Sequence, residues 1–114
     1  MKLEKCSYCG LCKSYCPVFK ALLEETKGAR GKAGLVRKEI MDEVFYECSL
    51  CGACKISCPA GIDLPKEIEN MRQKMVEAKV ETKANIVMIK NLREHGNPYG
   101  KIEKGKIPKG LYCC

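Results

Sequence analysis

The sequence predicts an all-α fold organised around two cysteine-rich motifs. Three observations support this prediction. The 114-residue chain contains 10 cysteines, eight of them in two copies of one short spacing. Between the copies, residues 18–47 carry apolar side chains at helical intervals instead of the alternation typical of strands. Residues 60–95, after the second copy, continue with the same helical periodicity. A chain of this length forms one small domain with a thin apolar core.

The two cysteine motifs begin at Cys6 and Cys48, and both follow the spacing C-x2-C-x2-C-x3-C-P. This spacing is typical of ferredoxin-type proteins with two 4Fe-4S clusters, in which the fourth cysteine of each motif binds the other cluster. We therefore predict two cross-ligated clusters and electron transfer between them. The predicted ligands are Cys6, Cys9, Cys12 and Cys58 for cluster 1, and Cys48, Cys51, Cys54 and Cys16 for cluster 2.

Glycine and proline occupy matched places in the two motifs. Gly10 and Gly52 lie between ligands, where the missing side chain is expected to let backbone N–H groups approach the cluster sulfurs. Pro17 and Pro59 follow the fourth cysteine of each motif and are expected to fix the direction of the next segment.

Two other uses of eight cysteines compete with this interpretation. Structural zinc sites also use C-x2-C pairs, but their pairs are usually separated by a longer loop. A disulfide framework needs an oxidising compartment, and no apolar signal segment follows Met1. We therefore expect a cytoplasmic protein with metal-bound thiolates.

The net charge of +7 favours neither nucleic acid nor membrane as a partner. Two oxidised clusters with their thiolates carry about −2 each and lower the total to about +3. The basic residues are interleaved with glutamates, and no nucleic-acid motif accompanies them. No apolar stretch is long enough to span a bilayer.

The segment between the motifs is predicted to hold two helices, over residues 18–26 and about 35–46. Gly28, Gly31 and Gly34 are expected to form the turn between them. A phosphate-binding loop is the alternative for this glycine run, but no strand precedes it. The turn would place Arg30 and Lys32 in solvent. The second helix is indicated by apolar residues at helical spacing, namely Leu35, Val36, Ile40, Met41, Val44 and Phe45.

After the second motif, Asp63 and Pro65 indicate the start of a helix, as a cap and a first-turn proline. Its core-facing stripe is predicted to be Leu64, Ile68, Met71, Met75 and Val76.

A further amphipathic helix is expected to end at Gly96, with Pro98 beyond it. Its apolar stripe could pack on this domain or dock another subunit, and the pattern does not decide between them. His95 is expected to interact with the terminal carbonyls of this helix. The stripe is formed by Ile86, Met88, Ile89 and Leu92.

Three segments resemble one family of redox proteins. Ala29–Lys32, Cys58–Asp63 and the Asn-Pro-aromatic-Gly stretch Asn97–Gly100, together with the doubled cysteine motif, are similar to the α-helical ferredoxin domain. This domain is found in the iron–sulfur subunits of heterodisulfide reductases and of anaerobic glycerol-3-phosphate dehydrogenase. It is also found in the iron–sulfur oxidoreductases that include lactate and glycolate oxidase components. The resemblance covers about residues 4–100.

The resemblance implies a relay subunit without a catalytic site of its own. Many of these relatives continue into domains with a Cys-Cys-Gly motif, whereas this sequence ends at Cys114. The implied partners are a flavoprotein or other redox subunits of an anaerobic oxidoreductase complex, or a soluble ferredoxin.

We expect residues 1–100 to form the dicluster domain and residues 101–114 a basic tail. The tail carries Lys101, Lys104, Lys106 and Lys109 and ends in Cys113 and Cys114. The two cysteines are either an inert reduced pair, additional metal ligands completed by a partner, or the redox pair of a catalytic thiol or heterodisulfide oxidoreductase component.

Overall fold

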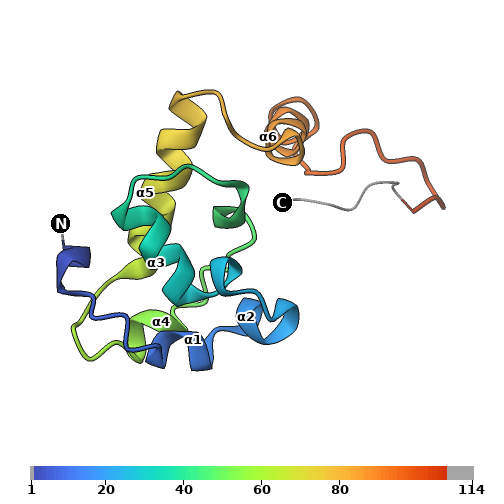
Figure 1. Ribbon diagram of the computed structural model, residues 1–114. Helices are drawn as coiled ribbons and strands as arrows, with labels where there is room; N and C mark the ends of the chain where they lie inside the picture. Colours follow the sequence, from blue (N-terminus) through green and yellow to red (C-terminus); the bar gives the residue numbers. More distant parts are fainter. Residues whose placement is uncertain (1, 108–114) are drawn as a thin grey trace. The chain divides into compact units, whose positions relative to one another are not determined.

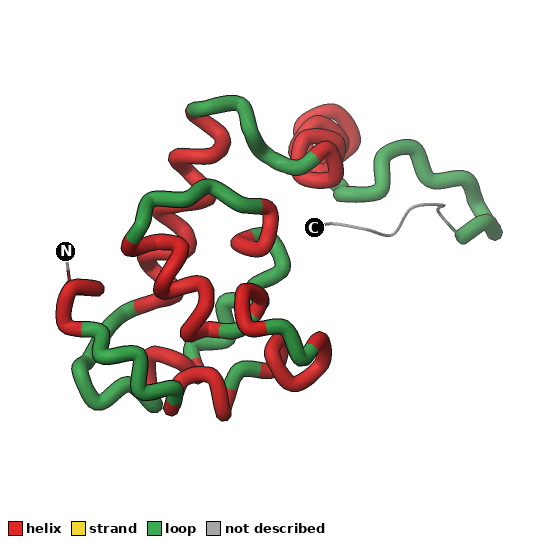
Figure 2. The backbone as a smooth tube through the Cα atoms, viewed as in Figure 1, coloured by secondary structure: helices red, strands yellow, loops and turns green. Residues whose placement is uncertain are grey.

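The computed structural model describes residues 2–107, and this range contains helices and turns but no strand (Figures 1 and 2). The predicted all-α class is therefore confirmed for the described part of the chain. The elements, with 3-10 helices labelled η, are η1 Lys2–Lys5, α1 Leu11–Tyr15, α2 Pro17–Leu22, η2 Glu25–Lys27, α3 Ala29–Arg37, η3 Glu43–Phe45, α4 Ala53–Ile56, α5 Leu64–Glu77 and α6 Lys83–His95.

The chain divides into two compact units, Met1–Val80 and Glu81–Cys114. Both cysteine motifs belong to the first unit. The predicted boundary between residues 100 and 101 stays a prediction, and Lys109, Cys113 and Cys114 lie outside the described residues.

The two cysteine motifs fold alike. In each, a glycine in the left-handed region precedes a short helix: Gly10 (φ 85°) before α1 and Gly52 (φ 78°) before α4. Two residues earlier, Tyr8 (φ 55°) and Leu50 (φ 53°) adopt the same left-handed conformation, which costs a non-glycine residue roughly 1 kcal/mol. Helices α1 and α4 pack against each other (Figure 1). The sequence repeat is therefore also a structural repeat, down to its strained positions.

The connector between the motifs differs from the sequence prediction. The helix expected over 35–46 is wrong, because α3 runs from Ala29 to Arg37 and ends in a Schellman motif. The N–H of Ile40 donates to the carbonyl of Leu35 (3.0 Å), and Glu39 holds the left-handed position (φ 54°) that glycine usually fills. Because no glycine marks this helix end, local residue preferences do not reveal it.

The turn expected at the three glycines is also wrong, since only Gly28 lies outside a helix, as the N-cap of α3. A Cβ added to Gly31 would lie 2.0 Å from the Glu25 carbonyl oxygen, so this glycine allows α3 to approach η2 closely. The helix expected over 18–26 is interrupted instead, because Leu23 (φ 56°) separates α2 from η2.

Helix α5 begins as predicted, with Oδ1 of Asp63 accepting a hydrogen bond from the Lys66 N–H (3.3 Å). Its predicted stripe is buried except for Val76, which is 41% exposed. The core of the first unit combines this stripe with α3, η1 and the segments flanking motif two: Leu3, Ala29, Ala33, Val36, Phe45, Tyr46, Ile62, Leu64, Ile68, Met71 and Met75.

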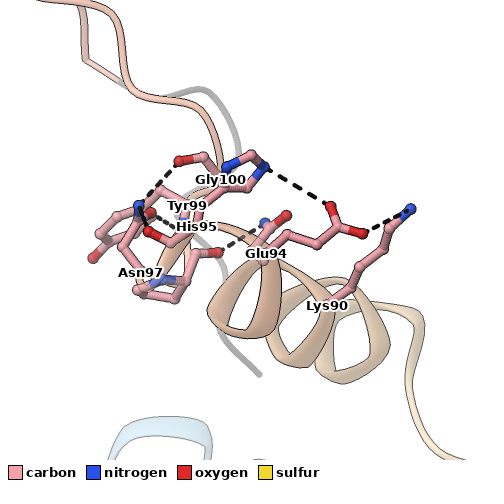
Figure 3. A network of polar contacts seen from close by, with 8 residues as sticks. Lys90, Glu94, His95, Asn97, Tyr99 and Gly100 are labelled. Carbon is pink, nitrogen blue, oxygen red and sulfur yellow. Dashed lines mark hydrogen bonds and ion pairs between the residues drawn. The ribbon is translucent and has the colours of Figure 1, made fainter.

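In the second unit, α6 ends as predicted at Gly96 (φ 72°), whose N–H donates to the Leu92 carbonyl (3.0 Å). The Asn-Pro-Tyr-Gly stretch then folds into a tight turn (Figure 3). Asn97 accepts from the Tyr99 N–H (2.9 Å) and donates to the Gly100 carbonyl (3.1 Å). The imidazole of His95, expected near the terminal carbonyls, has its Nε2 3.9 Å from a carboxylate oxygen of Glu94.

The stripe expected along α6 is only partly covered. Ile86 and Leu92 are 49% and 45% exposed, whereas Met88 and Ile89 are half-buried. None of the helices in residues 2–107 combines the length and apolar character needed to cross a bilayer.

Candidate metal centre

The first unit contains a cavity bordered by the four cysteines predicted for cluster 1. Cys6, Cys9 and Cys12 come from motif one, and Cys58 comes from the end of motif two. The cavity encloses about 350 Å³ of space between atoms, part of it open to solvent. The left-handed turns before α1 direct the first three cysteines around one space, and the packing of α1 against α4 brings the fourth to it.

A second cavity of about 360 Å³ repeats this arrangement with the motifs exchanged. Its cysteines are Cys48, Cys51 and Cys54 of motif two and Cys16 of motif one. The structure thus brings together both predicted sets of four, each with three cysteines from one motif and one from the other. All eight cysteines are free, and only Cys9 and Cys51 among them are exposed.

Burial changes the chemistry of one thiol in each cavity, Cys12 in the first and Cys54 in the second. Desolvation raises the pKa of Cys54 to about 11 and also raises the pKa of Cys12, where the neighbouring cysteines add to the effect. These thiols are therefore protonated at neutral pH in the metal-free chain. Iron binds the thiolate form, so metal binding at these positions must displace their protons.

Comparison with known families agrees with this donor set. Residues 2–62, which are more than half of the chain and contain both motifs, match the family model described as "4Fe-4S dicluster domain". The chain belongs to the 4Fe-4S dicluster domain family. It is therefore an iron–sulfur protein of the ferredoxin type, and two cavities with four thiols each fit two clusters. No curated protein matches the chain significantly.

The thiols of this dicluster domain border cavities and do not converge on a point. Among residues 2–107, no three Cys, His, Asp or Glu side chains form a group that could hold a single metal ion.

One backbone donor already contacts a motif sulfur. The N–H of Leu50 lies 3.4 Å from Sγ of Cys48 and donates to it. The prediction that Gly10 and Gly52 bring N–H groups to cluster sulfurs stays a prediction. What the structure shows for both glycines is the left-handed backbone that shapes each turn.

Two cations of α3 line the cavities. The prediction that Lys32 faces solvent is wrong, whereas Arg30 is partly exposed. Arg30 borders the first cavity, and Lys32 borders the second. Lys32 is only 1% exposed, and its ammonium donates to the carbonyl of Lys27. The burial lowers the pKa of Lys32, and the nearby Cys48 and Cys16 oppose this shift.

The sequence carried a signal for the buried lysine. Ala29, Ala33 and Val36 are spaced as one helical stripe, and all three are buried. Lys32 falls within this stripe, so a helix beginning at Ala29 places it on the buried side. That helix was missed because Gly31 and Gly34 favoured a turn at these positions.

Arg72 of α5 positions the start of motif two, and sequence reasoning missed it. Its Nε and one terminal nitrogen donate to the Phe45 carbonyl (2.9 and 2.7 Å), and that terminal nitrogen also donates to the Cys48 carbonyl (2.6 Å). Its guanidinium also lies 5.6 Å from the ring centroid of Tyr46. Arg72 thereby fixes the backbone of the first cysteine of this motif against the core helix.

Proposed function

We propose that this protein is an electron-transfer subunit of a multi-subunit oxidoreductase, with two 4Fe-4S clusters and no catalytic site of its own. The observation that carries the proposal is the reciprocal sharing of cysteines between the two cavities. Each cavity is lined by three cysteines of one motif and one cysteine of the other, so neither site is complete without both motifs.

The proposed ligands are the cysteines that border each cavity. Cys6, Cys9, Cys12 and Cys58 would hold one cluster, and Cys48, Cys51, Cys54 and Cys16 the other. A bound 4Fe-4S cluster accepts and releases single electrons over a range of potentials that its surroundings set. The chain itself supplies thiolates, partly apolar walls and close packing of the two motifs.

An exposed apolar patch supports contact with another redox protein. Leu11 and Tyr15 of α1 and Ile56 of α4 are 48%, 60% and 88% exposed, and together they line a shallow hollow. These residues lie in sequence among the last cysteines of both motifs. We infer that this patch is covered by a redox partner, which would bring its own cofactor close to both cavities.

The partners that we propose are a donor flavoprotein and a second electron carrier as acceptor, in the cytoplasm. This part of the proposal is supported by the resemblance of Ala29–Lys32, Cys58–Asp63 and Asn97–Gly100 to α-helical ferredoxin subunits. Ile56→Lys would introduce a charge into the patch and is expected to weaken complex formation while leaving the iron content unchanged. Unaltered co-purification of the variant with its partners would contradict this role of the patch.

The cross-ligation has its own test. In anaerobically purified protein, Cys16→Ser is expected to perturb the cluster of motif two, and Cys58→Ser the cluster of motif one. Ser14→Ala, an exposed change between Cys12 and Cys16, is the matched control. Electron paramagnetic resonance of the reduced wild type should show two interacting spins, and each cysteine variant should remove that interaction. A single isolated spin in the wild type would refute the proposal.

A further inference from the structure

Helix α3 presents one cation to each cavity. Arg30 and Lys32 are two positions apart, and on an α-helix this separation corresponds to about 200° of rotation. Their side chains therefore leave the helix on nearly opposite sides, and they line different cavities. The charge of Arg30 interacts with Cys9 and Cys12, and that of Lys32 with Cys48 and Cys16.

The residue between the two cations fixes their placement. A Cβ at Gly31 would lie 2.0 Å from the Glu25 carbonyl oxygen, so α3 lies directly against η2 at this point. On one side, a terminal nitrogen of Arg30 lies 3.5 Å from the Tyr8 carbonyl of motif one. On the other side, the Lys32 ammonium donates to the Lys27 carbonyl. The Arg-Gly-Lys triplet thus combines two opposed cations with one close backbone contact.

The two cations differ in how far their charge is compensated. Nε of Arg30 lies 2.6 Å from Oε1 of Glu25, which also pairs with Lys13 (2.9 Å). Arg30 is also partly exposed, so solvent and salt screen its charge. The hydrogen-bond acceptor of Lys32 is a neutral carbonyl, and the side chain is 1% exposed. Buried charges are screened much less than exposed ones, so Lys32 acts more strongly on its cavity.

We propose that Arg30 and Lys32 each favour the reduced form of the cluster in the cavity that it lines. Because of Lys32, the cluster in the second cavity is the more easily reduced of the two. That cavity is lined by Cys16, Cys48, Cys51 and Cys54. This inference rests on the proposed electron-transfer function. Reduction adds one negative charge to a cluster, and a nearby fixed cation stabilises that added charge. Electrons would therefore collect at the cavity of Lys32, which gives the two-site relay a direction.

A redox titration of the purified protein tests this inference, with dithionite as reductant and paramagnetic resonance as readout. At a fixed potential, Lys32→Met is expected to lower the ratio of reduced to oxidised cluster on the order of tenfold. For a one-electron couple this equals a shift of about 59 mV to lower potential. Only the paramagnetic signal of the cluster beside Lys32 should change in this way. Arg30→Met is expected to shift the other signal by less, and raising the salt concentration should reduce only the Arg30 effect.

Two variants serve as controls. Lys38→Met removes an exposed lysine just beyond the same helix and should leave both signals unchanged. Lys32→Arg retains the charge and should keep the wild-type order of the two signals. If Lys32→Met releases its iron, Arg30→Met and Arg30→Lys carry the test, since that side chain is partly exposed.

Iron and sulfide analysis of each variant separates two kinds of failure. If both clusters are present but neither reduction potential changes in Lys32→Met or Arg30→Met, the charge-tuning role is overturned. It is also overturned if one variant shifts both potentials together. A larger shift for Arg30→Met than for Lys32→Met would overturn the proposed direction. Absence of clusters from the wild type would instead refute the proposed function.

Discussion

Replacing Gly31 with alanine tests how closely α3 must approach the rest of the fold. The added Cβ would lie 2.0 Å from the Glu25 carbonyl oxygen, whereas real contacts of this kind are 3.0 Å or longer. The helix or η2 must therefore move by about 1 Å. Overpacking of this kind costs about 1–3 kcal/mol, and the upper value of about 3 kcal/mol applies here because the obstructing atom belongs to the backbone, which cannot rotate away. The better helix propensity of alanine offsets about 1 kcal/mol, so we expect a net loss of about 2 kcal/mol.

Gly34→Ala is the matched control in the same helix. Its Cβ would lie 3.6 Å from the Tyr8 ring, an ordinary contact, so the propensity gain of about 0.5–1 kcal/mol should remain. Thermal unfolding of the cluster-loaded protein, followed by far-ultraviolet circular dichroism without oxygen, compares the two. For a unit of this size we expect Gly31→Ala to lower the midpoint by about 10 °C and Gly34→Ala to raise it by a few degrees. A Gly31→Ala midpoint at or above that of the wild type would refute this reasoning.

Two further predictions concern charged side chains of the first unit. Arg72→Lys replaces a planar guanidinium that donates to two carbonyls with a single ammonium. The change should lower the free energy of unfolding by about 1–2 kcal/mol and accelerate the release of iron. Arg93→Lys on α6 is the control, and equal rates of iron release from the two variants would contradict the prediction. The pKa of Glu25 is lowered from 4.5 to about 2 by hydrogen bonds from Arg30 and Lys13. The stabilisation from this depressed pKa is present above pH 4.5 and is lost as the pH falls towards 2. Carbon-detected magnetic resonance should find Glu25 ionised at about pH 4 in the wild type but partly protonated in Arg30→Met, and identical titration in both would contradict the assignment.

The cysteine sets were predictable because the motif spacing determines local geometry. Three cysteines, each separated from the next by two residues, with a left-handed glycine between the second and third, form the same turn in both copies. In this fold, the packing of α1 against α4 brings the fourth cysteine of each motif to the cavity of the other motif. The structure places Cys16 and Cys58 in this way, although no single stretch of sequence contains a complete set.

The connector was not predictable from periodicity because its helix ends without the usual signals. Glu39 occupies the left-handed position that glycine usually fills, and Lys79 does the same after α5. Conversely, Gly31 and Gly34 lie inside α3, where one permits a close backbone contact. Tertiary packing decided these positions, and its effects cannot be deduced from local propensity.

The cations beside the cavities were missed for the same reason. The observed α3 begins earlier in the sequence than the predicted helix and includes two of the glycines. Lys32 therefore lies on the buried side of a helix and not in the solvent-facing turn that was predicted. A charged residue in a buried stripe is rare unless it has a polar partner, and here that partner is a backbone carbonyl. Recognition of the stripe of Ala29, Ala33 and Val36 would have indicated the burial but not the cavity that the lysine lines.

The most direct test of the two-cluster assignment is the amount of iron, acid-labile sulfide and zinc per chain in protein purified without oxygen. Two complete 4Fe-4S clusters in the two cysteine-lined cavities predict about eight iron and eight sulfide per chain. Zinc in place of iron, without sulfide, would contradict the electron-transfer function and assign the cysteines to a structural role.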